Sequence, residues 1–182
     1  MLNNKVLSYF GLFFMVLIVS CGTNERSNIK VFDLNEYWIK NSEVLQQEIQ
    51  LVKKRLVSDS SQVDLIDTIS DWKKELELFS SVKWNDKQAL QYDIDSTLNG
   101  QNRRIRYTAK DSSLEVQSLL IEKIESLGDE TARVRIHRKI EKSIYSINQE
   151  LYFDPLTGYF IKGQQKIPYI YDEYYQVFAQ WD

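Results

Sequence analysis

Apolar side chains recur at helical spacing through the first part of the chain. Asp33 is a favourable N-cap residue, and Glu36 three residues later can complete a capping box. From there, apolar residues fall on one broad side of a helix that we predict over residues 34–56. Residues 58–61 are polar and break that helix, and residues 62–67 form a short extended link.

A second apolar stripe follows at the same helical spacing. It predicts a helix over residues 69–81 and is made of Ile69, Trp72, Leu76 and Phe79. An aromatic residue at this spacing is normally part of a core, and we interpret Trp72 in that way.

Beyond residue 90 the pattern changes to alternation, and Asn99-Gly100 is a strong hairpin signal. We predict a two-residue turn with both of these residues at its centre. That register places Tyr92 opposite Tyr107, and Ile94 opposite Ile105. On the other face acid meets base, which a one-residue slip would undo; the pairs are Asp93 with Arg106 and Asp95 with Arg104.

Five more alternating segments follow the hairpin, separated by turn-forming residues. They cover residues 114–125, 131–140, 143–153, 159–167 and 173–181. The sequence therefore predicts one α+β domain over residues 31–182, with two N-terminal helices packed on one face of an antiparallel β-meander of about seven strands.

Composition agrees with a folded domain and limits its partners. The 182 residues include only two prolines and six glycines, and 13% are aromatic. The formal net charge is −3, and no basic stripe with interleaved aromatic residues is present. These features argue against a nucleic-acid partner.

The first twenty residues have the layout of a secretory signal peptide. Lys5 provides the positive start, residues 9–19 are apolar, and Ser20 precedes Cys21. The apolar run is shorter than the roughly 20 residues that a membrane-spanning helix needs. We therefore predict cleavage after residue 20.

Ile18-Val19-Ser20-Cys21 resembles the lipobox of bacterial lipoproteins, although Ile18 stands where leucine is usual. The resemblance implies that Cys21, the only cysteine, becomes the first residue and carries a diacylglyceryl group on its sulfur. Two acyl chains hold a protein on a membrane without a spanning helix. The alternative is an ordinary signal peptide that ends near a cysteine.

Residues 21–30 are then the lipidated cysteine and a polar tether. No acidic run follows Cys21, which favours the periplasmic face of the outer membrane over the cell surface. Two tripeptides, Asp67-Thr68-Ile69 and Asp95-Ser96-Thr97, resemble acceptor sites of periplasmic O-glycosylation.

Few side chains in this sequence suit catalysis. His137 is the only histidine and lies among cations on a predicted solvated strand face, so it is a poor proton acceptor. Acylation of Cys21 removes the only thiol, and the arginines opposite Asp93 and Asp95 explain that carboxylate pair. No phosphate-binding glycine loop or Gly-x-Ser-x-Gly elbow occurs. We predict no enzymatic activity, no metal site and no cofactor, although a hydrolase built from distant carboxylates stays open.

Aromatic residues crowd into the C-terminal strands. Consecutive residues such as Tyr174 and Tyr175 must point to opposite faces, so some rings face away from the helices. The first functional hypothesis is therefore a membrane-tethered, non-catalytic module that binds another envelope protein or a glycan.

The second hypothesis is a carrier or acceptor of a hydrophobic ligand. The predicted architecture is similar to the half-barrel of outer-membrane lipoprotein-sorting proteins, and a fold alone does not fix a function. This role requires a cavity between helices and sheet, with a lining of Trp38, Leu45, Trp72, Ile94 and Tyr107. The architecture also resembles uncharacterised small lipoproteins of Gram-negative bacteria, a resemblance that implies no activity.

Overall fold

The structure is a computed structural model that describes residues 31–124 and 127–181. The predicted signal peptide, Cys21 and the polar tether lie outside the described residues. Within them, no helix combines the length and the apolar character that a membrane span requires.

The described residues form four α-helices, one short 3₁₀ helix and nine strands. The helices are α2 (Leu34–Glu48), α3 (Trp72–Glu75), α4 (Glu77–Ser80), α5 (Asp86–Ala89) and the 3₁₀ helix η3 (Asp129–Thr131). The strands are β1 (Leu51–Ser58), β2 (Gln62–Thr68), β3 (Tyr92–Asn99), β4 (Asn102–Ala109), β5 (Val116–Ile124), β6 (Arg133–Glu141), β7 (Ser146–Asp154), β8 (Gly158–Ile167) and β9 (Tyr171–Gln180).

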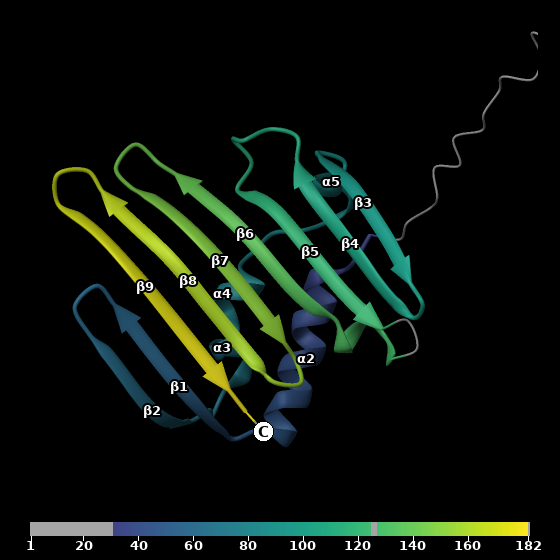
Figure 1. The fold of residues 1–182 in the computed structure, drawn as a ribbon, viewed down its shortest axis with the longest axis horizontal. Coiled ribbons are helices and arrows are strands. Elements are labelled where there is room, and N and C mark those ends of the chain that lie inside the picture. The colour runs from purple at the N-terminus through teal and green to yellow at the C-terminus, as the bar shows by residue number, and fades with distance from the viewer. Residues whose placement is uncertain (1–30, 125–126, 182) are drawn as a thin grey trace, which may run out of the picture. The chain divides into compact units, whose positions relative to one another are not determined.

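All nine strands belong to one antiparallel sheet with the order β2-β1-β9-β8-β7-β6-β5-β4-β3 (Figure 1). Strands β3 to β9 form a meander, and the hairpin of β1 and β2 joins its far edge by pairing β1 with β9. The α+β class is therefore confirmed.

The predicted number of strands is wrong because the hairpin β1–β2 was missed. The first helix ends at Glu48 instead of continuing to residue 56, and the extended link is strand β2. Residues 51–58 contain Lys53, Lys54 and Arg55, which suit a helix locally. Pairing with β9 overrides that preference, because Val52 is then buried on the helix side of the sheet and Lys54 pairs with Glu75 of α3.

The second predicted helix is also divided. Residues 69–81 contain two single-turn helices, α3 and α4, and a further helix, α5, was not predicted. Side-chain caps mark these starts: Asp71 accepts from the backbone N–H of Lys74, and Asn85 accepts from that of Gln88. The predicted N-cap of α2 is confirmed, since Asp33 accepts a 2.9 Å hydrogen bond from the backbone N–H of Glu36.

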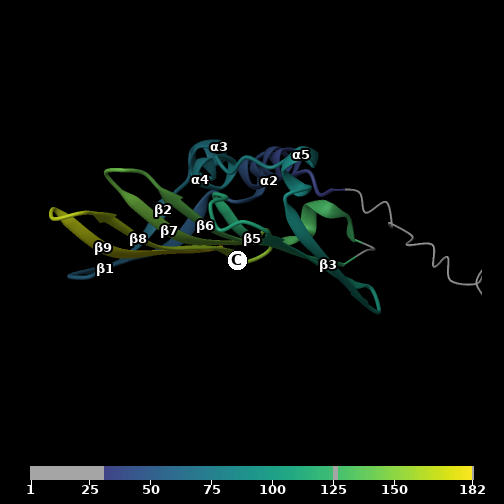
Figure 2. The same cartoon turned by 90° about the horizontal axis from the view of Figure 1, so that it is seen from above.

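The helices lie over one face of the sheet (Figure 2), and the core between them is rich in aromatic side chains. Trp38 of α2 packs edge-on against Phe153 of β7, with ring centroids 5.3 Å apart. Phe79 of α4 contacts the same Phe153 ring. Trp72 donates a 2.6 Å hydrogen bond from Nε1 to the carbonyl of Ile49, which ties α3 to the end of α2.

The hairpin of β3 and β4 is confirmed, but its predicted register is wrong by two residues. Asn99 pairs with Asn102, so the turn residues are Gly100 and Gln101. Gly100 has φ +62°, and a glycine at the first central position is what a type II′ turn requires. A shift of two residues leaves every side chain on its predicted face and changes only its partner.

Candidate functional site

The face of the sheet opposite the helices carries no helix among the described residues (Figure 2). We call it the uncovered face. One side chain from every strand lines up across it, because the registers of all eight strand pairs place these residues opposite one another. This central row consists of Asp64, Arg55, Phe178, Phe160, Tyr152, Arg135, Leu120, Arg106 and Asp95, from β2 to β3 in sheet order. At the usual strand spacing the row is about 38 Å long.

Three aromatic rings occupy the middle of this row. Tyr152 and Phe160 are stacked with centroids 5.3 Å apart, and Phe178 follows at 6.2 Å from Phe160. Their neighbours along each strand, such as Phe153 and Tyr159, point into the core instead. Phe178 is still 38% exposed. Tyr152 and Phe160 are half-buried. Antiparallel sheets usually present polar residues on a solvated face, so a partly exposed row of aromatic rings is a departure that suggests contact with another molecule.

Arginines flank the aromatic rings on both sides. The guanidinium carbon of Arg135 lies 5.0 Å from the centroid of Tyr152 and 5.7 Å from that of Phe160, within the range of cation–π attraction. On the other side, Arg55 is the cross-strand partner of Phe178. Each arginine therefore extends the apolar strip with a planar hydrogen-bonding group.

Carboxylates balance these cations. Arg135 Nη1 lies 2.7 Å from Glu150 Oε1, and Arg55 Nε lies 2.6 Å from Asp64 Oδ1. The hydrogen bond from Arg55 lowers the pKa of Asp64, which favours its charged form. The uncovered face thus has an apolar centre and a rim of both charge signs.

A hollow of ≈ 770 Å³ lies over one half of the row. Tyr152, Phe160 and Phe178 line it, together with Arg55 and Ile66 from the hairpin β1–β2. The hollow depends on the missed hairpin, since β1 and β2 provide its outer wall. A projecting side chain of a partner can fill a space of this kind.

The structure does not bring the predicted ligand-lining residues together. Trp38, Leu45, Trp72 and Tyr107 are buried in the core, whereas Ile94 is 43% exposed on the edge strand β3. Trp72 packs against Trp181, which directly follows β9. Tyr107, which lies on β4, packs against Trp84. Strands β9 and β4 are five positions apart in the sheet, which is about 24 Å.

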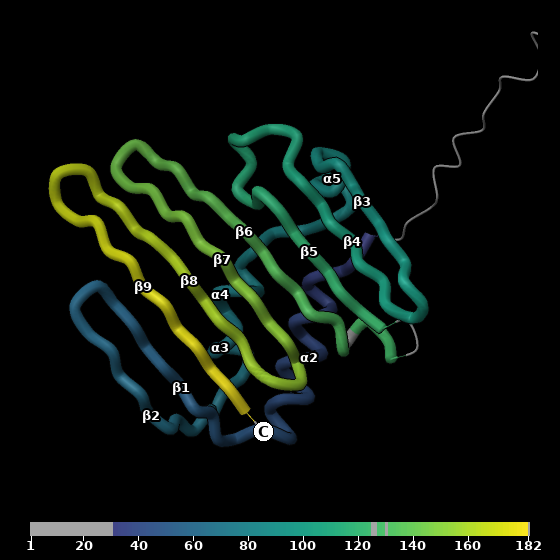
Figure 3. The backbone as a smooth tube through the Cα atoms, in the orientation of Figure 1, coloured from purple at the N-terminus to yellow at the C-terminus, as the bar shows by residue number. Residues whose placement is uncertain are grey.

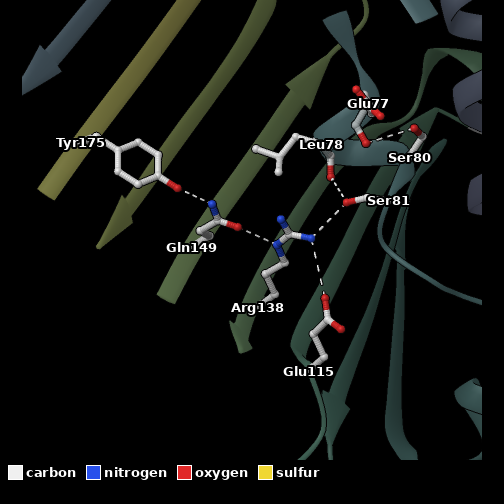
Figure 4. Close-up of polar contacts among 8 residues, drawn as sticks. All are labelled: Glu77, Leu78, Ser80, Ser81, Glu115, Arg138, Gln149 and Tyr175. Carbon is white, nitrogen blue, oxygen red and sulfur yellow. Dashed lines mark hydrogen bonds and ion pairs between the residues drawn. The ribbon is translucent and has the colours of Figure 1, made fainter. Parts of the chain in front are cut away.

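A buried polar network crosses the helix side of the sheet (Figure 4). Arg138 Nε donates to Gln149 Oε1 over 2.7 Å, and its Nη1 donates to Ser81 Oγ over 3.2 Å. Gln149 in turn donates to the hydroxyl of Tyr175, and Oε1 of Glu115 lies 3.7 Å from Nη1 of Arg138. Burial lowers the pKa of Arg138. The network holds the end of α4 on strands β6, β7 and β9.

The reactive residues considered in the sequence lie apart from one another. His137 is exposed on the uncovered face, where its Nε2 lies 2.8 Å from Asn148 Oδ1. The cross-strand partners predicted for Asp93 and Asp95 are wrong. Asp95 lies opposite Arg106, and Oδ1 of Asp93 is 3.9 Å from Nζ of Lys110. Over residues 31–124 and 127–181, no three His, Cys, Asp or Glu side chains gather as a metal site.

The chain matches no protein-family model, no curated protein and no solved structure.

Proposed function

We propose that this chain is a lipid-anchored envelope protein that binds another envelope protein through its uncovered face, without catalysis. The central row is the observation that carries the proposal. Aromatic and arginine side chains are enriched among the residues that dominate the energy of protein interfaces, and they act best inside a polar rim. Tyr152, Phe160 and Phe178, with Arg135 beside them, match that composition.

The ion pairs on the rim support a protein partner over a small anionic ligand. Arg135 and Arg55 are each paired with a carboxylate of the same face, so their positive charges are already balanced by neighbours. Paired rim charges instead set the orientation and the rate of encounter with a partner that carries both charge signs. The aromatic centre provides the affinity.

The lipid anchor is the second part of the proposal and rests on the lipobox resemblance at residues 18–21. A diacylated Cys21 confines the domain to a membrane surface. A partner in the same membrane is then met at a high effective concentration, so that a modest affinity is sufficient.

Site-specific photo-crosslinking in the native envelope tests the face. A photoreactive residue at Gln180, which lines the hollow, should capture a discrete protein adduct. The same residue at Lys73, exposed on α3 over the helix side, is the matched control and should not. Adding Phe178→Ala to the Gln180 probe should remove the adduct, because truncating a central aromatic typically costs 2 kcal/mol or more of binding energy, about thirtyfold in affinity.

Two results would contradict the proposal. One is the same adduct from both probe positions, and the other is an adduct at Gln180 that persists after Phe178→Ala. Binding of an isolated envelope glycan to the purified protein, abolished by Phe178→Ala, would replace the protein partner by a glycan on the same face.

A further inference from the structure

Two neighbouring hairpin connections expose apolar side chains at one end of the sheet. Ile144, between β6 and β7, is 70% exposed. Tyr169 and Ile170, between β8 and β9, are 108% and 81% exposed. Figure 3 shows both connections at the same end of the sheet. Ser146, which follows the first connection, pairs with Lys166, which precedes the second. We call Ile144, Tyr169 and Ile170 the apolar tips.

Tyr169 has a backbone conformation that its side chain disfavours. Its φ is +65°, and it is the only non-glycine residue with positive φ in the described parts of the chain. It follows Pro168 in a turn closed by a 3.1 Å hydrogen bond from the N–H of Ile170 to the carbonyl of Ile167. Proline followed by positive φ is the pattern of a type II turn, where glycine or asparagine is usual.

The domain itself gains nothing from this tyrosine. A bulky residue at positive φ destabilises the turn relative to glycine, and a fully exposed ring buries no surface in return. Retaining such a residue is understandable where the ring contacts something outside the chain. Ile170 and Ile144 are aliphatic and equally without cover, so the contact has apolar chemistry.

The charges around the tips favour an uncharged apolar surface. Nζ of Lys166 lies 3.7 Å from Oδ2 of Asp172, and Nζ of Lys139 lies 2.7 Å from Oε1 of Glu141. Cations and anions therefore alternate just behind the tips. The neighbouring connection at the same end, Ser58 to Ser61, is wholly polar. Tyrosine has an apolar ring with a polar end, and it is enriched where hydrocarbon meets headgroups in a bilayer.

We propose that the apolar tips insert into the interfacial region of the lipid bilayer that holds the anchor. The inference rests on the proposed function only for the anchor, which keeps the domain near the membrane. The ten residues from Cys21 to Lys30 span at most about 35 Å when extended, so the tether cannot carry the domain far from the lipid. With its tips in the interface, the sheet stands on its edge and turns the central row sideways, toward a partner in the same membrane.

A fluorophore on the tip tests this contact. Cys21 is the only cysteine, and acylation blocks it, so Ile170→Cys in the mature lipidated protein provides one thiol for an environment-sensitive dye. In phosphatidylcholine vesicles its emission should shift to the blue, and lipids with a nitroxide on the acyl chain should quench it severalfold more than a dye at Ser60→Cys on the polar connection. Equal emission and equal quenching at the two positions would overturn the proposal. A blue shift that nitroxide lipids leave unquenched would also overturn it, because it indicates contact with protein.

The variant Tyr169→Gly, combined with Ile144→Ser, separates this contact from folding. The glycine relieves the positive φ, so thermal stability in solution should not fall, while quenching of the dye at position 170 should decrease severalfold. Unchanged quenching would show that the apolar side chains do not make the contact. A chain that is not acylated is recognised separately, because the dye then also reacts with the thiol of Cys21. Adding the Cys21→Ser variant to vesicles tests binding through the apolar tips without the lipid anchor.

Discussion

Gly163 of β8 lies directly against the side chain of Tyr175 on the neighbouring strand β9. A Cβ added to Gly163 would meet the ring of Tyr175 at 2.6 Å. That ring carries the hydroxyl that accepts from Gln149, so the absence of a side chain at position 163 is what allows the buried network around Arg138 to close.

We predict that Gly163→Ala destabilises the protein by about 1–3 kcal/mol, the usual cost of overpacking. The added methyl group displaces Tyr175 and leaves Nε2 of Gln149 without its acceptor. Urea denaturation measures the change in the free energy of unfolding. The control is Gln164→Ala at the next position, on the uncovered face, which should change it by less than about 0.5 kcal/mol. Equal effects at both positions would contradict the role assigned to Tyr175.

A second residue-scale prediction concerns acid stability. Lys54 Nζ lies 2.7 Å from Asp67 Oδ2 and 2.8 Å from Glu75 Oε1, beneath α3. The hydrogen bond from Lys54 lowers the pKa of Asp67 from the ordinary value of 3.8. A lowered pKa in the folded state contributes stability above the unfolded-state pKa, and this contribution is lost as the pH falls below about 3.8.

Asp67→Asn should therefore weaken the fall in stability between about pH 5 and pH 2, and its effect should be largest near neutral pH. Denaturation midpoints across that range provide the measurement. Glu77→Gln, which changes an exposed carboxylate on α4, is the control. An unchanged pH profile in Asp67→Asn would mean that the ion pair does not contribute to folding stability.

At the scale of elements, α2 is the one long helix among the described residues, and local signals determine where it starts. Asp33 satisfies the backbone N–H of Glu36, and Glu36 pairs with Lys40 at 2.8 Å instead of closing a capping box. We predict that Asp33→Ala costs about 1 kcal/mol of stability. Asp33→Asn keeps a capping oxygen and should cost much less, and thermal unfolding of both variants distinguishes the cap from a charge effect.

The elements that the sequence predicted well are those specified by their own residues. The meander from β3 to β9 follows from alternation and from turn-forming residues such as Gly100. The hairpin β1–β2 was missed because its strands are stabilised by pairing with β9, a contact that no local pattern reveals. The central row was missed for the same reason: Arg55 reaches Phe178 only through that pairing. Alternation alone places Tyr152 and Phe153 on opposite faces of the sheet, so the aromatic centre of the row can be predicted from the sequence.

At the scale of the whole molecule, the two edges of the sheet differ from its middle. β2 is exposed at nearly every position and β3 is mostly exposed, whereas β5 to β8 carry the buried core residues. We predict that amide hydrogen exchange is slowest in β6, β7 and β8, and fastest in β2 among the strands, because edge strands open without disturbing the core. Slow exchange in β2 of the purified protein would show instead that a second molecule covers that edge.

The pairing of β1 with β9 also determines when the fold can be completed. Lys54 and Ala179 are partners in the sheet, although nearly the whole domain separates them along the chain. Such high contact order slows folding, typically to milliseconds or seconds. The hairpin β1–β2 is synthesised early and must wait with one edge open until β9 emerges. During that interval its exposed edge invites aggregation, so a chain that is exported unfolded would depend on chaperones until its last strand arrives.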